Sequence, residues 1–169
     1  MRERLAGTDQ ASLRSRGPEH DELRRSLLRG LRLAIVEPGY HGKRFVYERA
    51  NELGIDLVLV AEGDSWSREL VDDGVARTFV EAGTTGRPEE VAVAVLSALG
   101  PEADRLDGVL SFWEDSVPAA ARVAAALNLP GPPVTAADAA RNKLRTLQAS
   151  RDAALPTPRF MHQIGRAHV

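Results

Sequence analysis

Short apolar segments alternate with helical segments between residues 31 and 127, and this alternation constrains the fold more than any other feature. Runs rich in branched residues predict four strands, at 31–36, 55–60, 75–80 and 108–112. Amphipathic or alanine-rich stretches predict the helices that follow them, at 44–53, 66–71, 88–99 and 116–127. Strands that are apolar on both sides and separated by helices form parallel sheets covered on both faces. We therefore predict an α/β fold, an open, doubly wound, Rossmann-like parallel sheet.

Three further segments lie outside this alternation. Residues 1–30 are polar and rich in charge, so we expect a mobile N-terminal arm in which 20–29 form a short helix; docking of the arm to a partner is the alternative. Residues 136–153 predict one long alanine-rich helix that ends before Leu155-Pro-Thr-Pro158. Residues 163–169 resemble the translation of a common sequencing-adapter oligonucleotide, and we expect them to be foreign to a natural protein that continues beyond them.

Composition excludes several classes of function. A net charge of −2 provides no basic field for nucleic acid, and no apolar run reaches the length of a membrane span. The N-terminus lacks the apolar segment of a secretory signal, so we expect a cytoplasmic protein. The absence of cysteine excludes disulfides, thiolate catalysis and cysteine-ligated zinc. The four histidines do not share a helical metal-binding spacing, so we expect no metal site within these residues.

Lysine is rare in this chain. Of the 22 basic residues only Lys43 and Lys143 are lysines, and the rest are arginines. Where coding bias favours arginine, a lysine is more often retained for its own chemistry. Both lysines therefore deserve separate consideration as ligand-binding groups.

The loop after the first strand, residues 37–43, lies where open α/β sheets bind ligands, beyond the carboxyl ends of the strands. It contains Gly39 and Gly42 but matches neither the dinucleotide fingerprint nor the P-loop. One interpretation is that these glycines let the backbone approach a ligand, with His41 as a candidate base that lacks an identifiable carboxylate partner. The alternative is a tight turn from strand to helix, with Lys43 and Arg44 in solvent.

The loop after the fourth strand carries an aromatic residue and two carboxylates, Trp113, Glu114 and Asp115. Asp115 or Ser116 suits the capping of the following helix, because acids and hydroxyls satisfy the free amides of a first turn. Capping does not explain Trp113 and Glu114, so we predict that these two side chains line a site.

Motifs in the last third of the chain carry a family resemblance. They are the strand and loop at 108–115 (GVLSFWED), the helix exit at 124–131, the sequence AARNK at 139–143 and the sequence LPTP at 155–158. In this order they resemble the beginning of ATP-grasp ligases, and within that superfamily the carnosine synthases and bacterial L-amino acid ligases.

The resemblance implies a small α/β domain at 31–134, followed at 135–162 by the truncated start of an ATP-grasp domain. Such ligases use ATP and Mg²⁺ to convert a carboxylate to an acyl phosphate, which an amine attacks to form an amide. The implied substrates are a small-molecule carboxylate and an amine, both amino acids, and the product is dipeptide-like. By the match to the family motif, Lys143 contacts ATP. The magnesium ligands are expected outside this chain, which we expect to be inactive alone; a homo-oligomer is left open.

A second hypothesis comes from a different class of function. A doubly wound sheet can also serve as a non-catalytic module that binds a nucleotide or metabolite. The natural sequence beyond residue 161 distinguishes the two, because a ligase requires a downstream glycine-rich hairpin and metal-binding acidic residues.

Overall fold

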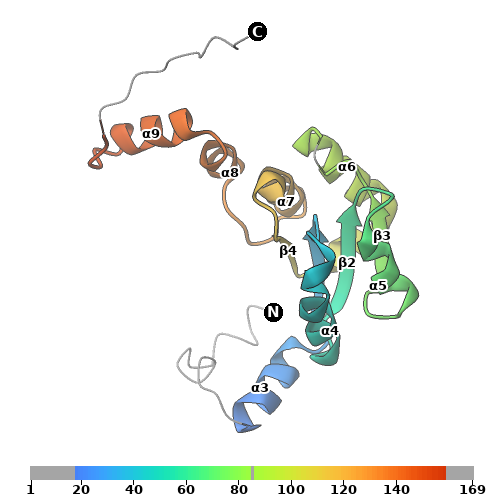
Figure 1. The fold of residues 1–169 in the computed structure, drawn as a ribbon. Helices are drawn as coiled ribbons and strands as arrows, with labels where there is room; N and C mark the ends of the chain where they lie inside the picture. Colours follow the sequence, from blue (N-terminus) through green and yellow to red (C-terminus); the bar gives the residue numbers. More distant parts are fainter. Residues whose placement is uncertain (1–17, 85, 159–169) are drawn as a thin grey trace.

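The computed structural model describes residues 18–84 and 86–158 and contains one four-stranded parallel sheet (Figure 1). Its strands are β1 (Arg32–Val36), β2 (Asp56–Ala61), β3 (Thr78–Glu81) and β4 (Gly108–Ser111). Their order across the sheet is β3-β2-β1-β4, and every neighbouring pair is parallel. The expectations for residues 1–17 and 163–169 fall outside the described ranges.

The strand order shows that the sheet is doubly wound, which confirms the predicted fold class. The chain places β2 and then β3 on one side of β1, and it returns to place β4 on the other side. The direction of winding therefore reverses between β1 and β4. In such sheets the ligand crevice opens at this switch point, outside the carboxyl ends of the two strands.

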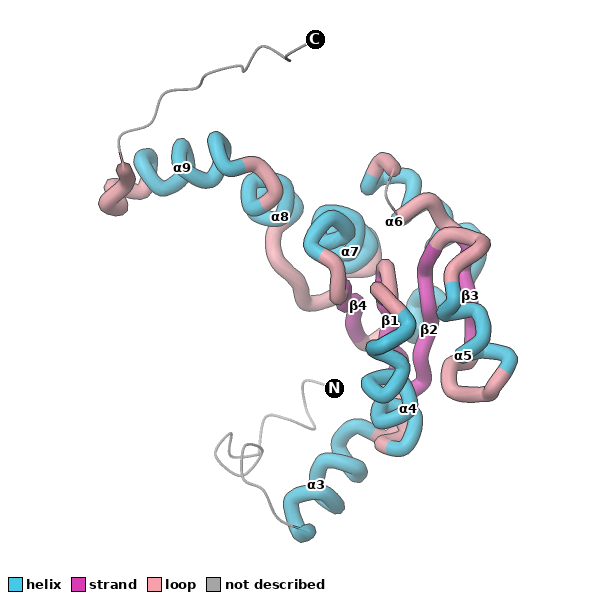
Figure 2. The backbone as a smooth tube through the Cα atoms, viewed as in Figure 1, coloured by secondary structure: helices cyan, strands magenta, loops and turns pink. Residues whose placement is uncertain are grey.

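Helices cover both faces of the sheet (Figure 2). One face packs against α4 (Arg44–Glu52) and α5 (Glu69–Asp72), and the other against α6 (Pro88–Leu99) and α7 (Val117–Ala126). Side chains of a strand alternate between faces. In β1, accordingly, Ala34 and Val36 join the core under α6 and α7, whereas Ile35 joins the core under α4 and α5.

The central strand β2 is the most deeply buried element. Its residues 57–61 are at most 2% exposed, and this explains why the segment is apolar without a polar alternation. Burial of each large aliphatic side chain stabilises the fold by roughly 1.5–3 kcal/mol. The sheet therefore provides a rigid base for the loops at its carboxyl edge.

The predicted strand at 75–80 is wrong at its start, because β3 begins only at Thr78. The amides of Val75 and Ala76 both donate to the carbonyl of Leu70, each at 2.8 Å. These bonds close the turn after α5, so the two amides cannot join the sheet. The first contact with β2 is made by the amide of Arg77, which donates to the carbonyl of Leu57.

The single helix predicted at 136–153 is also wrong. The structure contains two helices, α8 (Val134–Ala140) and α9 (Lys143–Asp152). Asn142 is extended, with φ −130° and ψ 105°, and its side chain accepts a hydrogen bond from the amide of Arg145. An asparagine in this position caps a new helix. In both views α8 and α9 lie progressively farther from the sheet than α7 (Figures 1 and 2).

The short helix predicted at 20–29 is present as α3 (Pro18–Leu28). The amide of Gly30 after it donates to the carbonyl of Gly54 at 2.7 Å, which ties the end of this segment to the α4–β2 turn. None of the helices within the described ranges combines the length and apolar character needed to cross a bilayer.

Candidate functional site

The loops that follow β1 and β4 meet at the switch point of the sheet. The ammonium of Lys43, at the end of the first loop, donates a hydrogen bond to the carbonyl of Phe112 at 3.1 Å. Residues 69 positions apart in sequence are thereby joined across the carboxyl edge. The two loops singled out from the sequence thus form one candidate site.

Glu37 fixes the start of the first loop. Its backbone has φ 55°, an unusual value for a non-glycine residue that costs roughly 1–2 kcal/mol. Its amide donates to the carbonyl of Val60, and its carboxylate accepts from the amide of Gly39 at 3.3 Å and from the hydroxyl of Thr84 at 2.5 Å. Thr84 is itself buried. These bonds from three directions hold the strained backbone in place.

Two aromatic side chains hold the middle of this loop. The buried Tyr47 donates its hydroxyl to the carbonyl of Pro38, and the indole of Trp66 donates to the carbonyl of Gly39, each at 2.6 Å. Burial raises the pKa of Tyr47, and the negative charge of Glu37 adds to the effect. The hydroxyl therefore remains a neutral donor over the whole physiological range. The exposed His41 packs edge-on against the Trp66 ring, with 5.2 Å between ring centroids.

Aromatic rings surround the ammonium of Lys43. The nitrogen lies 5.3 Å from the ring centre of Phe112, 5.7 Å from that of Tyr40 and 5.9 Å from that of Trp113. Ring faces attract a cation over such distances. The turn from strand to helix is tight, as the alternative expected, but the lysine side chain is half-buried and hydrogen-bonded instead of extending into solvent.

The two glycines of the loop make room for side chains of the loop itself. Gly39 has φ +80°, and a Cβ atom there would lie 3.3 Å from the Nζ atom of Lys43. A Cβ atom on Gly42 would lie 2.5 Å from the ring of Tyr40, which is impossible without movement. The glycines are thus explained by the packing of Lys43 and Tyr40. Direct approach of a ligand to Gly39, His41 or Gly42 stays a prediction.

A cavity of about 380 Å³ opens beside this arrangement. It is lined by the four successive residues Phe112, Trp113, Glu114 and Asp115. The guanidinium of Arg141 donates to the Glu114 carboxylate at 3.2 Å and also to that of Asp115. The cavity lining therefore combines two aromatic rings with an acidic pair that is partly neutralised by an arginine.

The expectation that Asp115 or Ser116 caps the following helix is wrong. Neither side chain accepts a hydrogen bond from the first turn of α7. Asp115 pairs with Arg141 instead, and the hydroxyl of Ser116 is buried with no hydrogen-bond partner in the described part of the chain. The acidic residues of this loop therefore face α8 and the cavity and do not serve the helix that they precede.

Lys143 begins α9, two residues after Arg141. Its side chain is exposed, and within residues 18–84 and 86–158 it makes no hydrogen bond or ion pair. The amino end of a helix favours negative charge. An ammonium that is free of acidic partners and sits in such a first turn suits contact with a phosphate. The ATP contact expected for Lys143 stays a prediction.

A partly exposed ion-pair network connects α8 to α6 and α7. Arg122 of α7 donates two hydrogen bonds to Asp138 of α8, at 2.8 and 3.0 Å, and a third to Glu89 of α6 at 2.8 Å. The hydrogen bond from Arg122 lowers the pKa of Asp138, although burial opposes the shift. The network connects three helices and so determines where Arg141 reaches the cavity.

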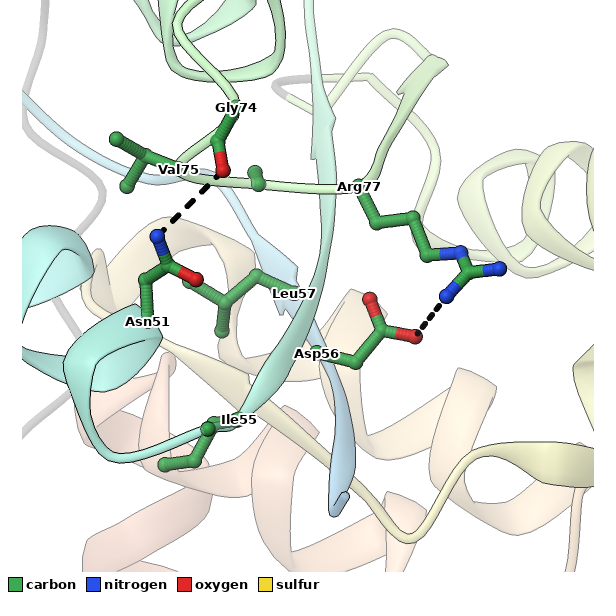
Figure 3. Close-up of a pocket in the computed structure, with 9 residues that line it drawn as sticks. Asn51, Ile55, Asp56, Leu57, Gly74, Val75 and Arg77 are labelled. Carbon is green, nitrogen blue, oxygen red and sulfur yellow. Dashed lines mark hydrogen bonds and ion pairs between the residues drawn. The ribbon is translucent and has the colours of Figure 1, made fainter. Parts of the chain in front are cut away.

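No group of three or more His, Asp or Glu side chains suited to a metal ion occurs among the described residues. A second hollow, of about 360 Å³, lies at the amino end of β2 (Figure 3). Figure 3 shows Asn51 facing the carbonyl of Gly74 at 3.5 Å and Arg77 facing Asp56 at 3.8 Å. This hollow is at the wrong end of the strands for a ligand site of an open α/β sheet.

Comparison with known proteins identifies relatives of the chain. Residues 47–131 match the ATP-grasp N-terminal domain family. Carnosine synthase 1 of Gallus gallus is 36% identical over 124 residues, covering 72% of this chain but only 13% of the relative. L-amino acid ligase from Bacillus licheniformis superposes with a TM-score of 0.61 at 27% identity, over 77% of this chain and 32% of that one. Phosphoribosylglycinamide synthetase from Anaerococcus prevotii, at 23% identity and TM-score 0.59, shares the fold over 73% of this chain and 29% of its own.

Proposed function

Because this chain belongs to the ATP-grasp N-terminal domain family, we propose that it is the first part of an ATP-dependent ligase that joins a carboxylate to an amine. The observation that supports this most strongly is the 36% identity to carnosine synthase 1 over 124 residues. The solved L-amino acid ligase supports the same reading from its fold. The chain spans about an eighth of the former and a third of the latter, so activity is proposed for a longer protein.

The proposed reaction follows from the poor reactivity of a carboxylate. An amine cannot displace oxide from it, so the γ-phosphoryl group of ATP is first transferred to a carboxylate oxygen, which releases ADP. The amine then attacks the acyl phosphate, the amide bond forms, and inorganic phosphate leaves with the carboxylate oxygen. Catalysis of such transfers consists mainly of positioning and of neutralising charge, for which Mg²⁺ is the usual partner of ATP.

In this proposal the start of α9 contacts ATP, and the two loops at the switch point contact the substrate. Lys143 contacts ATP as a point charge, a role that its free ammonium and its position in the first turn of α9 support. Trp113 and Glu114 line the substrate side, at the hollow of about 380 Å³. Arg141 connects the two, because it lies two residues before Lys143 and contacts Glu114. Amino acids as both substrates, and a dipeptide-like product, are part of the proposal.

The test uses the complete protein from the locus that encodes these residues. We expect ADP release in the presence of ATP, Mg²⁺ and a pair of amino acids, with one amide formed per ADP. Lys143→Met should raise the KM for ATP about 10- to 100-fold, the usual loss for a hydrogen bond to a charged group. Lys143→Arg should retain part of the function, and Arg151→Met, which removes a charge at the other end of α9, serves as the matched control.

Other outcomes would contradict the proposal. ATP binding without ADP release, for every pair of amino acids, would favour a non-catalytic binding module. For the 169-residue chain alone we expect no ADP above background, because it covers only 32% of the L-amino acid ligase. Robust turnover by this chain would contradict that part of the proposal.

A further inference from the structure

Lys43 is a cation that the described structure leaves without a counter-ion. The arginine next to it in sequence, Arg44, is neutralised by Glu48 and Asp73. Lys43, by contrast, forms no ion pair with any described residue, and its one hydrogen-bond acceptor is the carbonyl of Phe112. Within the described residues this ammonium is therefore contacted by one carbonyl and by aromatic rings, and by no carboxylate.

The surroundings hold this ammonium in one place and leave part of it open. Three aromatic rings lie within 5.9 Å of the nitrogen, and glycine at position 39 makes room for it. An ammonium has three N–H donors, of which the Phe112 carbonyl accepts one. Two donors thus remain at the switch point of the sheet, where ligands of this fold class bind.

The backbone around Lys43 is only partly available to an anion. Phosphate cradles present several free backbone amides to the anion. Here the amide of Gly39 is bound to the Glu37 carboxylate, and the amide of Lys43 is bound to the carbonyl of Tyr40, so contact with a ligand depends chiefly on the ammonium. A single ammonium with two open donors matches a group that carries one negative charge and two oxygens, which is a carboxylate. The exposed rings of Tyr40 and Trp113 suit the apolar remainder of such a molecule.

We propose that Lys43 binds a carboxylate group of a small-molecule substrate at the β1–β4 switch point. The rings of Tyr40, Phe112 and Trp113 hold the lysine ammonium in position. That the ligand is a substrate rests on the proposed function. The assignment adds a binding group on the first loop, distinct from the Lys143 contact with ATP and from the acidic pair of the cavity.

The rarity of lysine makes a direct test possible. Lysine labelled with ¹³C at the ε-carbon gives the 169-residue chain two labelled sites, and Lys43→Arg and Lys143→Arg assign their signals. Propionate, a carboxylate without an ammonium, should shift the Lys43 signal saturably and leave that of Lys143 in place. Propylammonium, and sodium chloride at matched ionic strength, should shift neither. Inorganic phosphate should act more weakly than propionate.

A second readout follows the indole N–H signal of Trp113 during the same titration. In Lys43→Met, which keeps the apolar stem, propionate binding should weaken at least tenfold, whereas Arg77→Met at the opposite edge of the sheet should bind as the wild type does. The unchanged amide spectrum outside the two loops verifies the fold of each variant.

Four results would overturn the assignment: an unmoved Lys43 signal; equal, unsaturable shifts of both lysines; a Lys43 shift with propylammonium alone; and tighter binding of phosphate than of propionate. The outcome is independent of the proposed function. An unmoved Lys43 signal refutes the carboxylate site even if the complete protein releases ADP. Conversely, if the complete protein has no ligase activity, a saturable propionate shift still demonstrates a carboxylate-binding site, although its role is then not catalysis.

Discussion

Replacement of Gly39 by alanine tests whether the first loop is built around Lys43. At φ +80° any L-residue is strained, which costs roughly 1–2 kcal/mol. The new Cβ would also lie 3.3 Å from both the Cδ and Nζ atoms of Lys43 and displace them. Loss of the contact between the ammonium and the rings adds about 0.5–1 kcal/mol. We therefore expect Gly39→Ala to lower the free energy of unfolding by about 1.5–3 kcal/mol in total.

Gly74 provides the matched control. Its φ of +72° is nearly the same, but a Cβ atom there would have no neighbour within 4 Å. Gly74→Ala should therefore show the backbone cost alone, about 1–2 kcal/mol. Urea unfolding followed by circular dichroism measures both variants. In a Lys43→Ala background, Gly39→Ala should lower the free energy of unfolding only by the backbone cost, as Gly74→Ala does. Equal losses for the two glycines in the wild-type background would refute the reasoning.

Three further predictions concern the groups that position the site. Asp138→Asn should reduce the free energy of unfolding at neutral pH. The difference from the wild type should vanish as the pH falls through the lowered pKa of Asp138, because the ionised carboxylate stabilises the folded state only above that pKa. Urea unfolding at a series of pH values measures this difference, and a constant difference down to pH 2 would argue against the network. Tyr47→Phe should cost about 1–2 kcal/mol by leaving the carbonyl of Pro38 without its donor. Since the pKa of Tyr47 is raised, its stabilising effect should persist below about pH 10 and decline above it. A tyrosinate absorbance titration that finds Tyr47 ionising near pH 10 would contradict the burial of this hydroxyl. Asn142→Ala should cost about 1 kcal/mol locally and speed amide exchange in α9 but not in β2, whereas uniform acceleration would show that the two helices unfold with the core.

Local sequence patterns were sufficient to predict elements whose position depends on burial and on local signals for the start of a helix. The continuous apolar run of β2 and the proline and glutamates that begin α6 allowed both elements to be predicted within one residue of their observed bounds. The start of β3 was missed because Val75 and Ala76 are as apolar as strand residues, yet their amides close a turn. The break at Asn142 was missed because the residues around it continue the helical pattern.

The site was predictable only in part for a related reason. Lys43, Trp113 and Glu114 each stood out as residue types, and their loops as places where ligands bind. Their contacts join positions far apart in sequence, such as Lys43 with Phe112 and Arg141 with Glu114, and no local pattern encodes such pairs. Glu37 is likewise held by a residue far away in sequence, since its carboxylate accepts a hydrogen bond from Thr84, 47 residues later.

The most direct test of the central claim follows the oxygen atoms of the substrate. The complete protein is incubated with ATP, Mg²⁺ and an amino acid pair whose carboxylates carry ¹⁸O, and the phosphate that is released is analysed by mass spectrometry. Activation through an acyl phosphate transfers one ¹⁸O atom from the carboxylate to inorganic phosphate for each amide formed, and this is the result we predict. Amide formation with unlabelled phosphate, or ¹⁸O in AMP, would contradict the proposed ligase chemistry.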